Sequence, residues 1–136
     1  MKSDKGAYIL YRIAKAEETY EVALLLAKNQ KWNATINRLY YAVYYAVSGL
    51  LAKNEIEAKS HAGIKTQFLL HFVKTGKIEM HLGRLYSDLF DWRQKGDYGD
   101  FFDFEETDVL PLMAPIRQLI DAVLEEVDND HSSLTQ

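Results

Sequence analysis

Between Trp32 and Ala52 the chain runs for twenty-one residues with a single charged side chain, Arg38. A helix that is apolar on nearly every side belongs in the middle of a helical bundle. A guanidinium carried into such a place must find an anionic or polar partner, because desolvating it without one costs several kcal/mol. We therefore expect Arg38 to be either half of a structural ion pair or the floor of a polar site.

The hydrophobic pattern of the whole chain predicts an all-α fold. Apolar residues recur with a seven-residue period in every long segment, and the strict alternation of a β-strand is never sustained. The pattern predicts helices over about residues 5–29, 32–53, 61–74, 78–95 and 106–128. Apolar residues that alternate at spacings of three and four line one face of each helix. This pattern predicts an up-and-down bundle of four to five helices. We expect a single domain over residues 1–129 and a flexible C-terminal tail over 130–136.

Three residues are expected to mark helix ends. Ser60 is suited to cap the N-terminus of the third helix, because its side-chain oxygen can accept a bond from a free amide of the first turn. Gly76 and Gly96 are suited to close the third and fourth helices in the left-handed conformation.

The segment between the last two predicted helices reads as an ordered loop. It is rich in turn formers and aromatic residues but lacks a helical period, so we expect Phe101, Phe102 or Phe104 to anchor it. Pro111 and Pro115 follow within the last helix, where each removes a backbone donor and crowds the preceding turn. A kink or a late start is expected there.

Composition narrows the possible functions. The 136 residues include no cysteine, which excludes a thiolate nucleophile and the usual structural zinc and fits a reducing cytoplasm. No signal peptide is visible, so we expect a cytoplasmic protein. The segment 32–52 is long enough to span a bilayer, but Arg38 would cost about 2.5–3.5 kcal/mol near its centre and four tyrosines crowd its middle. No membrane association is expected.

The net charge of −4 is unevenly distributed. Residues 1–96 carry fifteen Lys and Arg against nine Asp and Glu, whereas residues 97–136 carry one basic residue against eleven acids. The acidity of the whole chain argues against strong non-specific binding to nucleic acid, although a local basic patch can still meet phosphates. The candidate patch consists of Lys53, Lys59, Lys65, Lys74 and Lys77.

The common catalytic and cofactor motifs are missing from the sequence. No phosphate-binding loop, dinucleotide-binding glycine pattern or nucleophile elbow occurs, and no pair of histidines has helical metal-ligand spacing. His61 follows Ser60 directly, but neighbours on a helix point about 100° apart, so capping explains Ser60 better than nucleophilic catalysis does. We expect neither a metal nor a cofactor.

A polar cluster is expected where the second and fourth helices meet. Arg93 and Asp97 stand four residues apart at the end of the fourth helix and could simply pair with each other. Alternatively, Asp97 could reach across to Arg38, with Tyr41 or Tyr45 as hydrogen-bond donors. Such a cluster could form a nucleotide or phosphate pocket between helices, although tyrosines in this pattern also serve simply as packing.

Three motifs in order carry a family resemblance. They are Asn37-Arg-Leu-Tyr-Tyr-Ala-Val-Tyr-Tyr-Ala46, Ser60-His-Ala-Gly63 and Leu85-Tyr-Ser-Asp-Leu-Phe-Asp-Trp-Arg-Gln-Lys-Gly-Asp-Tyr98. Together the motifs resemble a small stand-alone bacterial HEPN domain (higher eukaryotes and prokaryotes nucleotide-binding). The resemblance implies a helical bundle that is often a homodimer and is related to the substrate-binding domains that accompany minimal nucleotidyltransferases. Many members of that family are RNA-cleaving toxins of toxin-antitoxin or defence systems.

The sequence departs from the pattern of the toxins. Active HEPN ribonucleases carry an arginine followed after four to six residues by a histidine. The arginine that matches is Arg93, and its window holds Tyr98 instead of a histidine. Cleavage of RNA needs an acid or base that works near neutral pH, a task to which histidine is suited and tyrosine is not. A ribonuclease would need a histidine such as His61 to converge from another helix.

Our leading hypothesis is a non-catalytic module that binds a nucleotide or another phosphate-bearing ligand, or that acts as the partner of a separate nucleotidyltransferase. The candidate ligand-binding residues are Arg38, Tyr41, Tyr45, His61, Arg93, Asp97 and Tyr98. An atypical RNA-cleaving toxin and a purely structural interaction module are the alternatives. In the last case Arg38 is only an ion-paired core residue.

Overall fold

The computed structural model describes residues 2–99 and 102–129, and every regular element in these ranges is helical. The helices are α1 (Lys2–Lys28), α2 (Trp32–Lys53), α3 (His61–Phe68), α4 (Met80–Tyr98) and α5 (Glu106–Asp128), and α3 continues into a π-helical turn, η1 (Leu69–Val73). The predicted all-α fold is therefore confirmed. The predicted flexible tail over 130–136 and the candidate anchor Phe101 lie outside the described residues.

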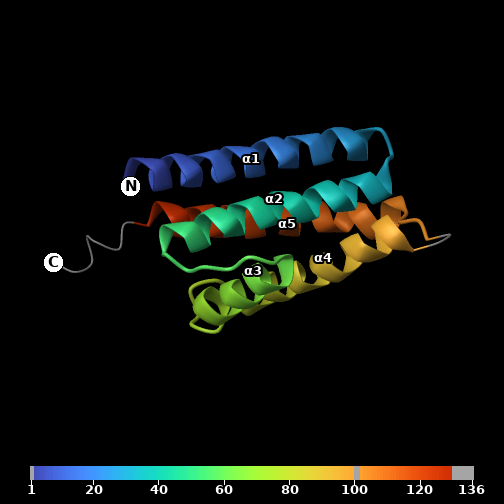
Figure 1. The fold of residues 1–136 in the computed structure, drawn as a ribbon. Helices are drawn as coiled ribbons and strands as arrows, with labels where there is room; N and C mark the ends of the chain where they lie inside the picture. The colour runs from blue at the N-terminus through green and yellow to red at the C-terminus, as the bar shows by residue number, and fades with distance from the viewer. Residues whose placement is uncertain (1, 100–101, 130–136) are drawn as a thin grey trace.

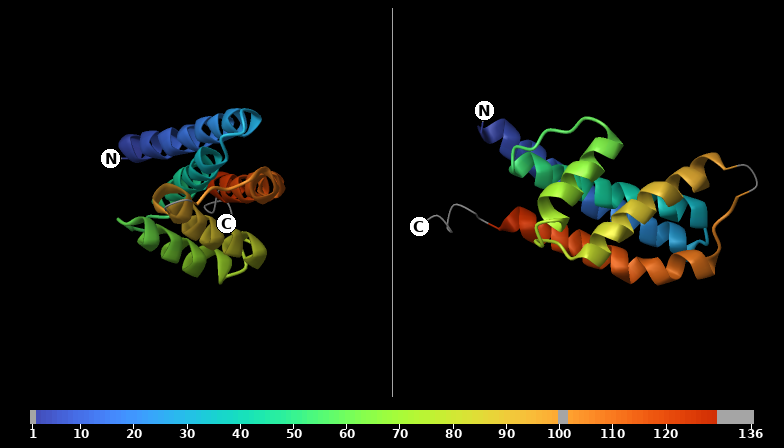
Figure 2. Two further views of the ribbon diagram at one scale, coloured as in Figure 1. Left: turned by 90° about the vertical axis from the view of Figure 1, so that its right-hand side faces the viewer. Right: turned by 90° about the horizontal axis from the view of Figure 1, so that it is seen from below.

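Helix α2 forms the centre of the molecule, as its apolar sequence predicts. It lies between α1 on one side and α3 and α4 on the other, and α5 runs along a further face (Figures 1 and 2). It packs against each of these four helices. Its buried seam consists of Ile36, Leu39, Val43, Ala46 and Leu50, all fully inaccessible to solvent. Burial on all sides leaves little room for a charged side chain, so Arg38 must emerge where the cover of α2 is incomplete.

Helix α3 begins where its capping residue predicts. The amide of Gly63 donates to Ser60 Oγ at 2.8 Å, which satisfies one of the free donors of the first turn. This bond fixes His61 as the first residue of the helix. Gly76 has φ of +83°, so it adopts the left-handed conformation expected of it just beyond η1. The two ends thus hold α3 and η1 in place beside α2.

The prediction that Gly96 ends the fourth helix is wrong. Helix α4 continues to Tyr98, and Gly96 is instead a point of close packing. A Cβ atom at Gly96 would lie 3.0 Å from Cε2 of the Phe104 ring, a tight contact that would require the ring to shift by a few tenths of an ångström. The extra turn matters for function, because it places Asp97 on the helix itself.

The loop before α5 is held by a residue of α2. Asn33 Oδ1 accepts a hydrogen bond from the Phe104 amide at 2.7 Å, and its Nδ2 donates to the Phe102 carbonyl at 3.2 Å. Of the two proposed phenylalanines that the structure describes, Phe104 is half-buried and anchors the loop, whereas Phe102 is exposed. Helix α5 starts at Glu106 in spite of its two prolines, so the expected late start does not occur.

Candidate functional site

Arg93 lies almost entirely inside the protein without a strong partner. Its side chain is 10% exposed, and its Nη1 atom is 3.8 Å from Asp97 Oδ2. Its guanidinium carbon lies 4.7 Å from the centre of the Tyr40 ring and 5.9 Å from that of Tyr41. Its Nε atom is buried and has no hydrogen-bond partner among the described residues. A buried donor without a partner costs free energy, so this arginine is poorly satisfied by the protein alone.

Arg38 reaches the same cluster from α2. Its guanidinium carbon lies 5.1 Å from the centre of the Tyr41 ring, which therefore has both arginines close to it. Its Nε and Nη2 atoms donate to Asn37 Oδ1 at 3.0 and 2.8 Å. Asn37 Nδ2 in turn donates to Asp97 Oδ2 at 3.1 Å. One amide side chain thus accepts from Arg38 and donates to Asp97.

The arrangement decides between the two pairings proposed for Asp97. Within the described residues the carboxylate forms its ion pair with Arg93, and Arg38 is linked to it only through Asn37. The alternative, a direct pair between Arg38 and Asp97, is therefore absent from this part of the chain. Asn37 fills the space between them, because its amide can satisfy a donor on one side and an acceptor on the other.

His61 completes the cluster from α3. Its ring stacks on Tyr44, with the ring centres 4.3 Å apart and an angle of 11° between the planes. Its Nδ1 atom lies 2.8 Å from the hydroxyl oxygen of Tyr40. Burial, followed by the nearby positive charge of Arg93, lowers the pKa of His61 below its usual value. Burial raises the pKa of Tyr40, so the phenol stays protonated and can donate to the neutral imidazole.

The structure brings five of the seven candidate residues together. Arg38, Tyr41, His61, Arg93 and Asp97 form one cluster where α2, α3 and α4 meet, which we call the Arg93 cluster. Of the other two candidates, Tyr45 lies at the edge of the cluster, with its ring centre 6.0 Å from that of Tyr41, and Tyr98 lies outside it. Tyr45 contacts Arg12 of α1, with the guanidinium carbon 5.4 Å from its ring centre, and Tyr98 is 77% exposed at the end of α4.

Three members of the cluster were not predicted from the sequence. Tyr40 is fully buried and contacts both Arg93 and His61, Tyr44 carries the stacked histidine, and Asn37 bridges two charges. The apolar seam of α2 offered no signal for Tyr40, since a buried tyrosine reads as packing. A signal did exist for Asn37, because it is an amide next to the one charge of the segment.

The cluster has an excess of positive charge. Among the described residues it contains two guanidiniums and one carboxylate, and its imidazole is neutral at pH 7. Arg38, Arg93 and His61 supply the hydrogen-bond donors that are not used within the cluster. The N–H groups of an arginine match the oxygens of a phosphate or carboxylate. No group of three or more His, Asp or Glu in residues 2–99 and 102–129 could hold a metal ion. The charge and the donors of the cluster are those that an anion would require.

Comparison with known proteins places the chain in a family. The sequence profile of the HEPN domain matches residues 9–127, which is almost the whole chain. The chain belongs to the HEPN domain family. The resemblance carried by the three motifs is thus confirmed, and the helical bundle that it implies is the one observed.

Relatives of this HEPN domain are found in bacteria and archaea. A UPF0332 protein of Thermotoga maritima is 36% identical over 121 residues, which cover 89% of this chain and 92% of that protein. Two Methanocaldococcus jannaschii proteins whose names call them candidate toxins are 31% and 35% identical over 86 and 83 residues. This chain spans about 58% and 62% of their lengths.

The sequence predicts that no segment crosses a membrane, and the helices can be compared with this expectation. None of the helices in the described part of the chain combines the length and the apolar character that crossing a bilayer requires. Helix α2, with 22 residues, includes the segment that is long enough, and Arg38 lies within it.

Proposed function

We propose that this HEPN domain binds a phosphate-bearing ligand, such as a nucleotide, at the Arg93 cluster. The observation that carries the proposal is the state of Arg93. This side chain is nine-tenths buried, yet its contact with Asp97 is long and its Nε donor has no partner in the described residues. Proteins rarely retain such a group in a core unless it binds something, because an apolar side chain would be no less stable there.

The neighbouring residues support an anionic ligand. Arg38 approaches Tyr41 from α2 as Arg93 does from α4, so a phosphate near that ring could receive donors from both. The half-buried rings of Tyr41 and Tyr44 offer stacking surfaces close by, and bases stack well on aromatic side chains. A site with two arginines beside aromatic rings can bind both the phosphate and the base of a nucleotide. Such a site therefore suits a nucleotide better than inorganic phosphate.

Calorimetric titration with AMP, ATP, inorganic phosphate and a short single-stranded RNA tests this proposal. We expect binding by the unaltered protein and a loss of about ten- to hundredfold in affinity in Arg38→Gln and Arg93→Gln, since each removes charge-assisted hydrogen bonds. Arg84→Gln is the matched control, because Arg84 is exposed on the same helix as Arg93. Absence of binding to all four ligands, or equal affinity in the three variants, would overturn the proposal.

Cleavage of RNA is the second candidate function. It is favoured by the position of His61, which comes from a different helix but lies close enough to Arg93 for the arginine to lower its pKa. Active HEPN ribonucleases have a histidine shortly after the arginine, and the sequence just after Arg93 has none. His61 would supply the missing imidazole beside the Arg93 guanidinium from another helix. The names of the two M. jannaschii relatives point in the same direction.

Incubation of the purified protein with total RNA separates the two candidate functions. A ribonuclease should give new fragments that disappear in His61→Gln and persist in His71→Gln, whose histidine is exposed on η1. Intact RNA, together with unimpaired growth of cells that express the protein, would reject this candidate and leave the binding function.

Two assemblies accompany the proposal. A separate nucleotidyltransferase is the partner that the family resemblance suggests, and a homodimer is the expected self-association. Co-expression with a nucleotidyltransferase encoded next to this protein, followed by affinity purification, tests the first assembly. Light scattering after size-exclusion chromatography tests the second, for which a mass of 15.7 kDa would be the contradicting result.

A further inference from the structure

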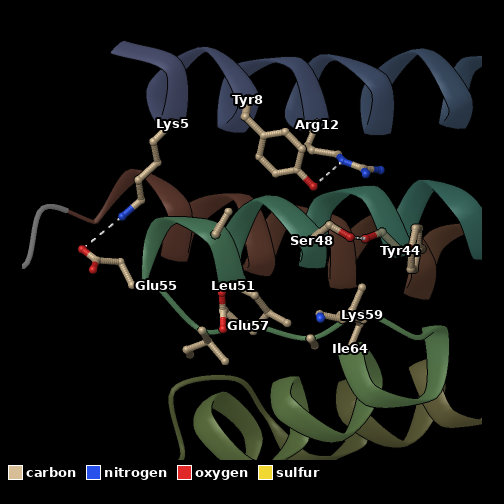
Figure 3. A pocket seen from close by; sticks show the side chains of 13 residues that line it. Lys5, Tyr8, Arg12, Tyr44, Ser48, Leu51, Glu55, Glu57, Lys59 and Ile64 are labelled. Atoms are coloured by element: carbon tan, nitrogen blue, oxygen red, sulfur yellow. Dashed lines mark hydrogen bonds and ion pairs between the residues drawn. The ribbon is translucent and has the colours of Figure 1, made fainter. Parts of the chain in front are cut away.

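A wide groove lies on the side of α2 that faces α1, away from Arg93. Its floor is formed by residues of α2, including Ser48 and Leu51, and one wall by Tyr8 and Arg12 of α1 (Figure 3). The opposite wall is formed by the connection between α2 and α3 and by the start of α3. Its volume of about 1180 Å³ exceeds the roughly 300–1,000 Å³ of most small-molecule pockets. We call it the α1 groove.

Arg12 is held in position at this groove but is not neutralised. Its guanidinium carbon lies 5.1 Å from the ring centre of Tyr8 and 5.4 Å from that of Tyr45. Its Nε atom donates to the Tyr8 hydroxyl at 2.9 Å (Figure 3). No carboxylate in the part of the chain that the structure describes lies within 4.0 Å of it. The hydrogen bond of Nε leaves the Nη atoms available for an external carboxylate or phosphate.

The rest of the lining decides which kind of anion fits. The apolar side chains of the groove that solvent reaches are Ile56, which is half-buried, and Tyr8, which is 44% exposed, so an occupant must bring apolar groups of its own. Two carboxylates also line it. Glu55 is paired with Lys5 at 3.1 Å, whereas Glu57 has no ion-pair partner among the described residues and would repel a phosphodiester backbone. Lys59 is exposed on the wall opposite Arg12 and adds a further positive charge to the groove. A polypeptide with both apolar and acidic side chains satisfies all of these conditions, whereas a nucleic acid strand does not.

We propose that the α1 groove is a docking site for an amphipathic segment of a partner protein. The segment places aliphatic side chains on Ile56 and on the exposed ring of Tyr8, and an Asp or Glu side chain on Arg12. A peptide in a groove lined by apolar residues and flanked by charges is a recurring mode of recognition, in which the apolar residues contribute affinity and the charges fix orientation.

The groove is distinct from the Arg93 cluster but touches it. Tyr44 lines the groove and also carries the stacked ring of His61, so the two sites share one side chain. A partner segment in the groove would therefore contact the support of His61. The proposal does not depend on a phosphate ligand, and each site has an arginine that the other does not use.

Selection from a displayed library of random twelve-residue peptides tests the proposal. We expect enriched peptides that combine two or more aliphatic residues with an Asp or Glu, and that bind Arg12→Glu at least tenfold more weakly. Their binding should be unchanged in Arg84→Glu, which reverses an exposed charge on α4, and in Arg93→Gln. Circular dichroism and thermal unfolding verify that each variant is folded.

A charge exchange makes the test specific. A selected peptide whose acidic residue is replaced by Lys should bind Arg12→Glu more tightly than it binds the unaltered protein. Amide shifts on addition of the peptide should lie at Tyr8, Arg12 and Ile56. Peptides that bind Arg12→Glu as tightly as the unaltered protein, shifts confined to other surfaces, or a selection without an acidic aliphatic pattern would each overturn the proposal.

Discussion

Replacing Arg93 by methionine distinguishes a binding residue from a structural one. Loss of the two contacts with the rings of Tyr40 and Tyr41 should cost about 1 kcal/mol each. The 3.8 Å contact with partly exposed Asp97 contributes only about 0.2–1 kcal/mol. Against these losses, removal of a buried donor without a partner recovers about 1–3 kcal/mol. Contacts of the new sulfur with the rings add about 0.3–1.5 kcal/mol.

These contributions nearly cancel, so the free energy of unfolding of Arg93→Met should lie within about 1 kcal/mol of that of the unaltered protein. Urea denaturation followed by circular dichroism measures this difference, and Arg84→Met serves as the exposed control. In the same variant the affinity for AMP should fall at least tenfold. A loss of about 3–5 kcal/mol would instead be the cost of breaking a buried ion pair and would refute the reasoning.

Three further substitutions test individual features. The lowered pKa of His61 means that the unfolded chain binds a proton more readily, so the contribution of this residue is complete above about pH 6.5 and is lost as the pH falls below it. Urea titrations between pH 7.5 and 4.5 should therefore show a shallower loss of stability in His61→Gln, and equal slopes would contradict this. Ser60→Ala should lower the free energy of unfolding by about 1 kcal/mol through loss of the helix cap. An unchanged midpoint in urea would show that the cap is not needed. Gly96→Ala should cost about 1 kcal/mol in spite of its higher helix propensity, since its Cβ atom would meet the Phe104 ring. A more stable variant would show that the ring moves freely.

Most of the fold follows from local sequence signals. The limits of α2 and α5 coincide with those predicted, because both helices carry long apolar patterns. The cap at Ser60 was also correct, since it depends on the residue and its immediate neighbours. Helix α4 was predicted to end too early, because the role of Gly96 comes from Phe104, a contact between distant segments that no local rule contains.

The site could be predicted only in part. An isolated charge in an apolar helix pointed to Arg38, and the spacing of Arg93 and Asp97 pointed to their pairing. The bridge formed by Asn37 depends on the orientation of its side chain, and the approach of His61 depends on how α3 lies against α2. Both are consequences of tertiary packing. The α1 groove likewise arises only when α1 and the start of α3 flank α2.

The resonances of the arginine side chains give a decisive test of the Arg93 cluster as an anion site. In a spectrum of the Nε–H groups, addition of AMP at pH 7 should shift the signals of Arg93 and Arg38 together, with saturation at one equivalent. The signal of Arg84 should stay in place. An Arg93 signal that does not move while AMP binds would contradict the proposed site, because the unpartnered Nε donor at the base of the cluster would then have no part in binding.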